Sequence, residues 1–269
     1  MRNIFLLFVT LSMLSCQKVI DINPTTSKVT VIIQAYLYKD SIAFVEVNKS
    51  TAYLTQVNPP NISTAVVTLT DNNGVTETLT WNPNTDRHES ITMKGVVNNT
   101  YTLKVVLEGK TYTSVSVLPD LIPADSITVV HKAKSVFQKE GYYMQLYAHI
   151  PTNVDLYYLF KAADDSSFMF KPNEIDLGDN KNLNGNIQGL DMGFQFQPVE
   201  NAHLYIFSLT KPAYDFYNAA SLQLNNDGGF FSTPPANVPS MFDNGAIGLF
   251  QCSTIQELST LVVVQPVTQ

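Results

Sequence analysis

From residue 29 onward the chain alternates apolar and polar side chains with a period of two, in short runs separated by turn signals. In the first run Val31, Ile33 and Ala35 share one side. Asp-Asn-Asn-Gly at 71–74 is a hairpin signal, because Asn and Gly tolerate the positive φ of a tight reversal. This pattern predicts an immunoglobulin-like antiparallel β-sandwich over residues 28–120. The runs that carry it are residues 29–37, 43–47, 65–70, 78–81, 101–107 and 111–118.

Two prolines, Pro119 and Pro123, predict a boundary, since they interrupt both helices and central strands. Beyond them we expect a second β-rich domain over residues 121–269, so the fold class is all-β. Its one helix is predicted near 211–224, with Thr210 as N-cap and Pro212 in the first turn. The strands expected in this domain are 126–130, 142–150, 155–161, 167–171, 193–198, 203–209, 246–251 and 261–264.

The N-terminus reads as a leader peptide. Arg2 precedes an apolar run over residues 4–14, which is too short to span a bilayer, and Ser15 and Cys16 follow. A small residue directly before a cysteine is typical of a lipoprotein signal peptide, which predicts cleavage after residue 15 and a lipid on Cys16. The alternative is an ordinary signal peptide with a free cysteine nearby. The polar residues 16–27, with Pro24, are predicted to be a tether.

Charge and cysteine content narrow the possible partners. The chain has a net charge of −7, and removing residues 1–15 takes away one arginine and no acid, which leaves −8. An acidic surface argues against nucleic acid and against adhesion to anionic lipid headgroups. If the thiol of Cys16 carries lipid, Cys252 has no cysteine partner, and we expect it to be a small buried side chain rather than half of a disulfide.

Motifs for catalysis are missing from the sequence. It contains no GxSxG, Walker, GxGxxG or HExxH pattern, and the pair Asp164 and Asp165 is better explained as a solvated turn. Four histidines are scattered without the spacing of a metal site. We therefore expect no enzyme, no metal and no cofactor. The histidines are His88, His131, His149 and His203.

Residues 180–191 partly match a calcium-binding loop. Asn180, Asn182 and Asn184 occupy positions one, three and five, Gly185 position six and Asp191 position twelve. The carboxylate usual at position one is missing, and Asn-Gly pairs also form ordinary turns. The turn is the preferred interpretation, and calcium is the alternative.

Aromatic residues gather between positions 142 and 170. Such rings fill β-sandwich cores, and they also form exposed platforms that stack on ligands or partner proteins. We expect core packing for most of them, and no single position is specific enough to assign to a ligand. The residues are Tyr142, Tyr143, Tyr147, Tyr157, Tyr158, Phe160, Phe168 and Phe170.

Several segments together resemble a known family. After the leader and tether come Gly-Lys-Thr-Tyr at 109–112, Asp-Ser-Ile at 125–127, a helix with Tyr214 and Tyr217, and Asn-Gly-Ala-Ile-Gly-Leu-Phe at 244–250. In these features the chain is similar to the Bacteroidota lipoproteins catalogued as domain of unknown function 4249. The resemblance covers nearly the whole mature chain. It implies an outer-membrane lipoprotein, often encoded beside TonB-dependent receptors, and brings no catalytic residues.

Two functions remain open at this point. The first is a lipid-anchored binding or accessory protein of the cell envelope, at the periplasmic or surface face of the outer membrane, with a TonB-dependent nutrient transporter as partner. The second is a structural or adhesive surface lipoprotein without a small-molecule ligand. An enzyme is a distant third.

Overall fold

The structure is a computed structural model that describes residues 29–51, 59–151, 153–165, 167–168, 175–181, 185–226 and 238–264. Every strand and the helix of the described residues lie within one compact unit made of Thr30–Ser50 and Pro59–Gln269. Cys16, the leader, the tether, Asn182, Asn184 and Phe170 lie outside the described residues. Within the described part, no helix has the length and apolar character that crossing a membrane requires.

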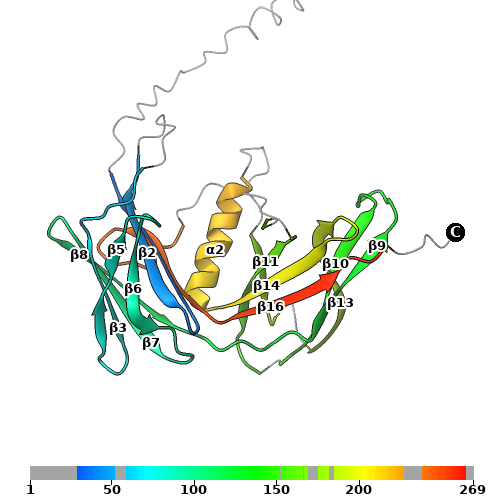
Figure 1. The fold of residues 1–269 in the computed structure, drawn as a ribbon, viewed down its shortest axis with the longest axis horizontal. Coiled ribbons are helices and arrows are strands. Elements are labelled where there is room, and N and C mark those ends of the chain that lie inside the picture. The colour runs from blue at the N-terminus through cyan, green and yellow to red at the C-terminus, as the bar shows by residue number, and fades with distance from the viewer. Residues whose placement is uncertain are drawn as a thin grey trace, which may run out of the picture. The chain divides into compact units, whose positions relative to one another are not determined.

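The first β-sandwich has two facing sheets, with strand orders β15-β1-β2-β6-β5 and β4-β3-β7-β8 (Figure 1). Both sheets pair neighbouring strands antiparallel except for β1 with β15. The strands are β1 (Val31–Tyr38), β2 (Ile42–Lys49), β3 (Val66–Asp71), β4 (Thr76–Thr78), β5 (Thr80–Asn82), β6 (Arg87–Lys94), β7 (Thr100–Leu107), β8 (Lys110–Val117) and β15 (Ile247–Ser253).

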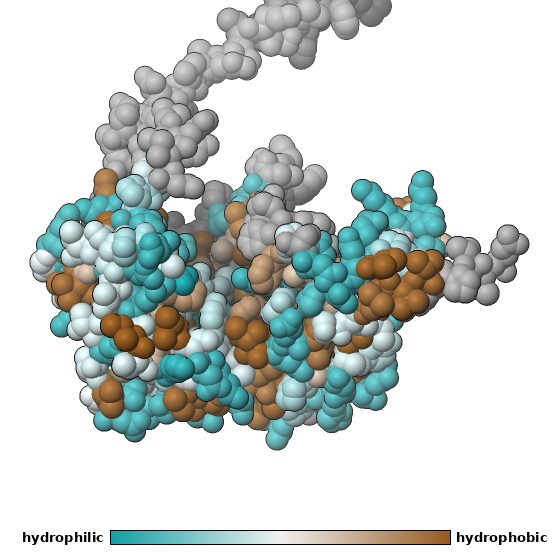
Figure 2. All heavy atoms as spheres, in the orientation of Figure 1, coloured by the Kyte–Doolittle hydropathy of each residue, from teal (hydrophilic) through white to brown (hydrophobic). Residues whose placement is uncertain are grey.

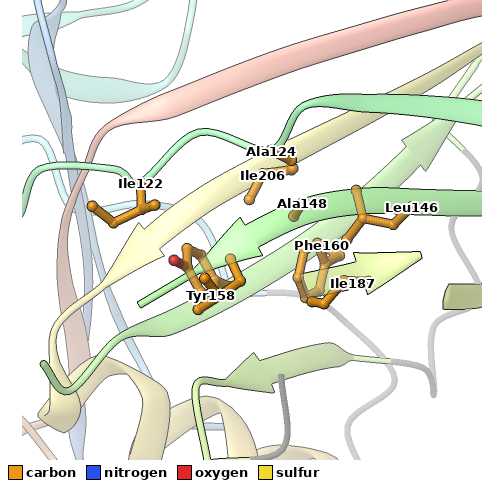
Figure 3. A pocket seen from close by; sticks show the side chains of 9 residues that line it. Ile122, Ala124, Leu146, Ala148, Tyr158, Phe160, Ile187 and Ile206 are labelled. Carbon is orange, nitrogen blue, oxygen red and sulfur yellow. The ribbon is translucent and has the colours of Figure 1, made fainter. Parts of the chain in front are cut away.

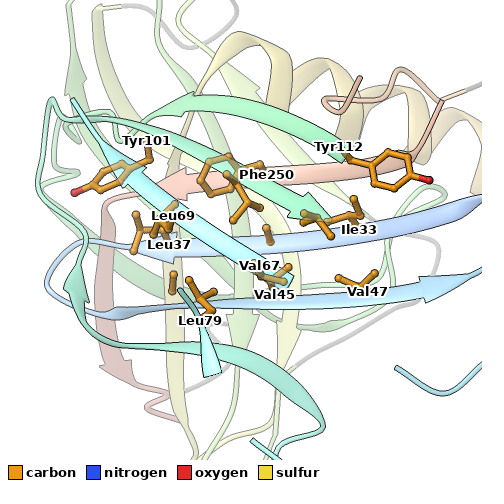
Figure 4. Packing of buried hydrophobic residues seen from close by; sticks show 14 of the residues in the cluster. Ile33, Leu37, Val45, Val47, Val67, Leu69, Leu79, Tyr101, Tyr112 and Phe250 are labelled. Carbon is orange, nitrogen blue, oxygen red and sulfur yellow. The ribbon is translucent and has the colours of Figure 1, made fainter. Parts of the chain in front are cut away.

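The core of this sandwich follows from the period-two pattern. Ile33 and Leu37 of β1 are fully buried, while Gln34 between them is exposed, because successive strand side chains point to opposite faces. They pack with Leu69 (Figure 4) and in the same cluster as Leu103, both from the facing sheet. The sandwich is thus the immunoglobulin-like fold that the alternation predicted.

A tyrosine at the start of β7 adds a feature found in such sandwiches. The hydroxyl of buried Tyr101 accepts a hydrogen bond from the Val96 backbone N–H at 2.8 Å and donates to the Lys94 carbonyl at 3.2 Å. The tyrosine corner of immunoglobulin-like domains makes this same return contact to nearby upstream backbone. It fixes the chain reversal between β6 and β7.

Strand β15 comes from the far end of the chain and completes the first sandwich. It pairs in parallel with β1, for example Ile33 with Gly248 and Ala35 with Phe250, and the Phe250 ring is buried in the core. The division into domains 28–120 and 121–269 stays a prediction. The observed sheets add that a strand from the second range belongs to a sheet of the first.

The hairpin predicted at 71–74 is present between β3 and β4. Gly74 has φ +84°, and the Asp71 carboxylate accepts hydrogen bonds from the Asn73 and Val75 backbone N–H groups, both at 2.9 Å. The single return strand expected at 78–81 is instead divided. Strand β4 pairs with β3, whereas β5 pairs with β6 in the opposite sheet, and buried Leu79 is the crossing point.

The second sandwich has sheets β13-β10-β9 and β12-β11-β14-β16. Its core includes Met144, Phe196 and Leu204, all less than 3% exposed. Its strands are β9 (Ser126–Lys132), β10 (Gly141–Ile150), β11 (Tyr157–Ala163), β12 (Asp176–Asp179), β13 (Gly185–Phe196), β14 (Asn201–Leu209) and β16 (Ile255–Leu261).

Three expectations for this part need correction. The strand expected at 193–198 is the end of β13, which begins at Gly185, and the strand expected at 261–264 is replaced by β16. Of the strand expected at 167–171, the described part shows a single bridge between Ala163 and Phe168. The glycines within β13 resemble turn signals, and the polar and apolar residues of β16 do not alternate. The full extent of these strands was therefore not predicted.

The helix α2 (Lys211–Leu224) matches its predicted bounds. The Thr210 side chain accepts a hydrogen bond from the Ala213 backbone N–H, and Pro212 lies in the first turn. Ala213 is buried against Leu159 of β11, Phe207 of β14 and other residues on the outer face of the sheet β12-β11-β14-β16, whereas Leu224 at the end of the helix is exposed.

Val199, in the turn between β13 and β14, is strained. It has φ +71°, where a β-branched side chain clashes with its own backbone, and its side chain is 74% exposed. We expect Val199→Gly to raise the free energy of unfolding by about 1 kcal/mol, because the strain is removed and little packing is lost. Urea denaturation measures this. The control Val263→Gly, at an exposed position without positive φ, should instead lower it slightly, and a loss in both variants would refute the assignment of strain.

Candidate functional site

The aromatic residues between 142 and 170 do not form one platform. Tyr158 and Phe160 point into the second core, while Tyr157 points to the opposite face of the same sheet and packs on Tyr214 of α2. Phe168 is 54% exposed, and its ring is tilted against that of Tyr205 with 5.2 Å between the ring centroids. Most of these rings thus serve packing. On the face shown in Figure 2, apolar residues form separate patches interrupted by polar ones.

The calcium-loop interpretation finds no support in the described residues. The Asn180 side chain is buried, and its carbonyl oxygen accepts a hydrogen bond from the Leu156 backbone N–H at 3.1 Å. Asp191 lies within β13, pairs with Lys132 and accepts from the Gly193 backbone N–H. These two oxygens stabilise local structure. Among the described residues, no group of three or more His, Cys, Asp or Glu side chains is placed to hold a metal.

The histidines and the paired aspartates also have structural neighbours. Buried His88 contacts the Ile62 carbonyl at 3.0 Å through Nε2, and His203 lies 3.0 Å from Glu257. Asp164 accepts from the Ser167 backbone N–H at 2.8 Å, and Asp165 accepts from the backbone and side chain of Asn201, both at 2.9 Å. The Asp164 carboxylate therefore caps its own turn, as the sequence suggested, while that of Asp165 links this turn to the start of β14.

A row of three rings joins the two sandwiches. Tyr38 of β1 lies 6.1 Å from Phe44 of β2 and 5.9 Å from Phe207 of β14, measured between ring centroids. A cation covers each end of this aromatic row: the Arg87 guanidinium lies 4.2 Å from the Phe44 centroid, and the Lys161 ammonium 5.3 Å from that of Phe207. Burial lowers the pKa of Lys161. Because the rings already contact one another and the cations, the aromatic row acts as an internal joint.

Next to this joint lies a buried polar network. The Tyr217 hydroxyl of α2 donates to the Gln251 side chain of β15 at 2.6 Å, and Gln251 donates to the Ser253 hydroxyl at 2.8 Å. Tyr36 of β1 hydrogen-bonds to Tyr217. Burial, with the nearby charge of Glu46, raises the pKa of Tyr36 to about 12. The network fixes the helix and the sheet together.

The apolar cavity of the second sandwich is too small for a ligand. It leaves about 10 Å³ for the centre of a water-sized sphere, which is room for one water at most. Figure 3 shows the side chains that line it. Its lining is almost wholly aliphatic or aromatic: Ile122, Ala124, Leu146, Ala148, Ile150, Tyr158, Phe160, Ile187 and Ile206.

The Tyr158 hydroxyl in this cavity has no hydrogen-bond partner among the described residues. Since an unpaired buried hydroxyl is destabilising, we expect Tyr158→Phe to raise the free energy of unfolding by about 1 kcal/mol. Chemical denaturation of the variant measures the change. Tyr101→Phe is the matched control, because it removes two backbone hydrogen bonds and should lower stability by about 1–2 kcal/mol. If the two variants changed the free energy of unfolding equally, the Tyr158 hydroxyl would not be an unpaired, destabilising group.

A wider groove lies at the edge of the first sandwich. It has a volume of about 250 Å³ and is lined by Thr80, Trp81, Asn82, Pro83, Glu89, Ser90 and Ile91. The Glu89 carboxylate is fixed there by Asn82 at 2.8 Å, Arg87 at 2.6 Å and Thr85 at 3.0 Å, and these hydrogen bonds, led by that of Asn82, lower the pKa of Glu89. A tryptophan beside a fixed carboxylate and amide can stack on and hydrogen-bond a polar ligand.

Sequence reasoning placed Trp81 on a strand but gave no reason to single it out. The signal that was available is that Trp81 is the chain's only tryptophan and precedes Asn-Pro. Nothing in the sequence indicated that Glu89 lies near Trp81, because β6 was not predicted. The pairing of β5 with β6 brings the two residues together.

Cys252 is a free, buried thiol on β15. Burial raises its pKa to about 12, so it is protonated and unreactive at neutral pH. This agrees with the small buried side chain expected from the cysteine count.

Comparison with known proteins identifies a family and little more. No curated protein matches the chain. Among solved structures, a two fibronectin type-III domain segment from chicken tenascin matches with 8% identity and a TM-score of 0.24, covering 67% of this chain and 91% of that one. A family profile described as domain of unknown function (DUF4249) matches residues 17–259, which is most of the sequence, and the protein therefore belongs to that family.

Proposed function

We propose that this chain is a lipid-anchored binding or accessory protein of the cell envelope, held at the outer membrane by a lipid on Cys16. The observation that carries the proposal is the N-terminal pattern: a charged residue, a short apolar run, then Ser15 and Cys16, ahead of a folded body that begins with β1 at Val31. A TonB-dependent nutrient transporter is the proposed partner. That partner rests on the resemblance to Bacteroidota lipoproteins, and the proposal includes no catalysed reaction.

The anchor is tested on protein isolated from native membranes. Mass spectrometry of the N-terminal peptide should find cleavage before Cys16 and an acylated sulfur, and Cys16→Ala should abolish both. Cys252→Ala is the matched control, because its thiol is buried in the fold and should leave lipidation unchanged. A bare sulfur on Cys16, or an uncut leader, would refute the anchor.

The partner is tested separately by chemical cross-linking in intact cells, followed by purification of the tagged lipoprotein. Recovery of a TonB-dependent receptor would support the accessory role. Loss of that receptor in the Trp81→Ala, Glu89→Gln double variant would place the contact at the groove. Recovery of no receptor would refute that role.

A structural or adhesive role is the second candidate. The observation that favours it is the joint between the sandwiches: the aromatic row and the Tyr36–Tyr217–Gln251 network fasten them as a spacer would require. Loss of surface adhesion in a deletion strain, without a defect in nutrient uptake, would favour this role over the transporter partner.

A further inference from the structure

The connection between β9 and β10 exposes two apolar side chains at its tip. The Ser135 backbone N–H donates to the Gln138 carbonyl at 2.9 Å, and the Phe137 N–H donates to the Ser135 hydroxyl at 3.3 Å. Val136 and Phe137 are therefore the two central residues of a tight turn. Their side chains are 92% and 98% exposed, the largest values among the exposed large hydrophobics of the described residues. Figure 1 shows β9 and β10 as neighbouring strands.

Turn geometry does not explain these residue types. Tight hairpin turns favour Asn, Gly and Asp. Neither Val136 nor Phe137 has a positive φ, so the backbone does not restrict which residue types can stand there. An exposed phenylalanine beside an exposed valine gains nothing from the fold of this chain. Their apolar surface is available to something outside it.

The charges around the tip have one sign. Between residues 133 and 139 the only charged side chains are those of Lys134 and Lys139, both exposed, in a chain whose net charge is −7. Farther down the hairpin, Lys132 is paired with Asp191, and Glu140 lies 3.3 Å from His131. Counting Lys132, Lys134 and Lys139 against Asp191 and Glu140, the end of the hairpin has a net charge of +1, with the two lysines next to the apolar residues. Repulsion from the acidic remainder is screened over about 8 Å at physiological ionic strength.

We propose that the β9–β10 tip inserts into the surface of a lipid bilayer, with Val136 and Phe137 in the acyl boundary and Lys134 and Lys139 at the phosphates. A convex tip of two residues offers far less area than a stable protein–protein interface needs, whereas a fluid bilayer buries it without a matching shape. Lysines next to the apolar residues fit the phosphate layer. The inference rests on the proposed lipid anchor, which keeps the chain beside a membrane; the tip gives the folded body its own contact.

Vesicle sedimentation tests the insertion. The protein is the chain from Gln17 onward without lipid, which contains every described strand and the helix. It should bind vesicles of phosphatidylcholine with phosphatidylglycerol, and Val136→Asp with Phe137→Asp should weaken binding at least tenfold. Lys134→Glu with Lys139→Glu should weaken binding about tenfold or more on these anionic vesicles, and less on pure phosphatidylcholine.

The matched control is a second pair of exposed valines, Val115 and Val117 of β8. Val115→Asp with Val117→Asp makes the same chemical change elsewhere and should leave vesicle binding unchanged. Tryptophan fluorescence gives a readout that does not depend on affinity. When vesicles are added, the emission of the Phe137→Trp variant should shift to shorter wavelength and be quenched by brominated lipid, whereas the emission of Trp81 in the wild-type protein should show neither change. The tip variants should keep the wild-type melting temperature, because neither apolar side chain of the tip is buried.

The proposal would be overturned if the wild-type protein bound neither kind of vesicle, if the Val115 and Val117 variant lost binding equally, or if the tryptophan at position 137 were not quenched. If the tip variant lost a cross-linked protein partner while keeping vesicle binding, the tip would be a protein contact and the proposal would also fall. A bare sulfur on Cys16 together with normal vesicle binding would refute the anchor but leave the tip in place.

Discussion

Raising the pH from 9 to 12 is expected to unfold this protein. Burial raises the pKa of Tyr36, Tyr158 and Cys252 to about 12, against ordinary values of 10 for tyrosine and 9 for the thiol. Above those ordinary values the unfolded chain releases protons that the folded chain retains. Stability contributed by these groups is therefore complete below pH 9 and is lost as the pH rises toward 12.

The size of this loss follows from linkage. Each group costs about 1.4 kcal/mol per pH unit once the unfolded form ionises, so three groups together remove of the order of 5–10 kcal/mol. That is comparable with the whole stability of an ordinary domain. Urea denaturation followed by circular dichroism at pH 8, 10 and 11 should show the midpoint falling steeply.

Tyr158→Phe provides the control, since it removes one of the three groups and should flatten the decline by about a third. Tyrosine absorbance gives a second check. Some tyrosines should ionise only together with the loss of structure. If all thirteen tyrosines ionise near pH 10 while the circular dichroism stays native, the explanation by burial is wrong.

Phe250→Ala is expected to destabilise the first sandwich by about 3–5 kcal/mol. The ring is 1% exposed and packs in the core formed by β1, β3 and β7, so its removal leaves a large cavity. Trp81, the only tryptophan, lies on β5 of the same sandwich and reports its unfolding by fluorescence. The urea midpoint of the tryptophan signal should therefore fall markedly.

Val115→Ala, on an exposed face of the same sandwich, is the control and should change stability by less than about 0.5 kcal/mol. A Phe250→Ala protein whose tryptophan signal keeps the wild-type midpoint would mean that the first sandwich closes without β15.

The sequence predicted elements where local rules govern them. The alternation at Val31–Tyr38, the turn at Asp71 and the capped helix after Thr210 each depend on neighbours in the chain, and each is present. The division of one expected strand into β4 and β5 was not accessible, because both halves have strand composition. Only their partners differ.

The candidate site was harder to predict from the sequence, because it too depends on which strands pair with each other. Its groove depends on β6 pairing with β5, and the tip at Val136 and Phe137 depends on a turn that lacks the usual turn residues. Nothing in the local sequence shows that a valine and a phenylalanine in succession lie in water rather than in a core. The leader around Cys16 lies outside the described residues, and its role stays a prediction.

Because β15 is hydrogen-bonded beside β1, the first sheet cannot close until nearly the entire polypeptide has left the ribosome. Until then one edge of β1 lacks its partner, because β15 lies more than two hundred residues later in the sequence. We expect this long-range pairing to slow the folding of the first sandwich. It also means that a premature stop codon near the 3′ end of the gene would cripple the domain encoded first.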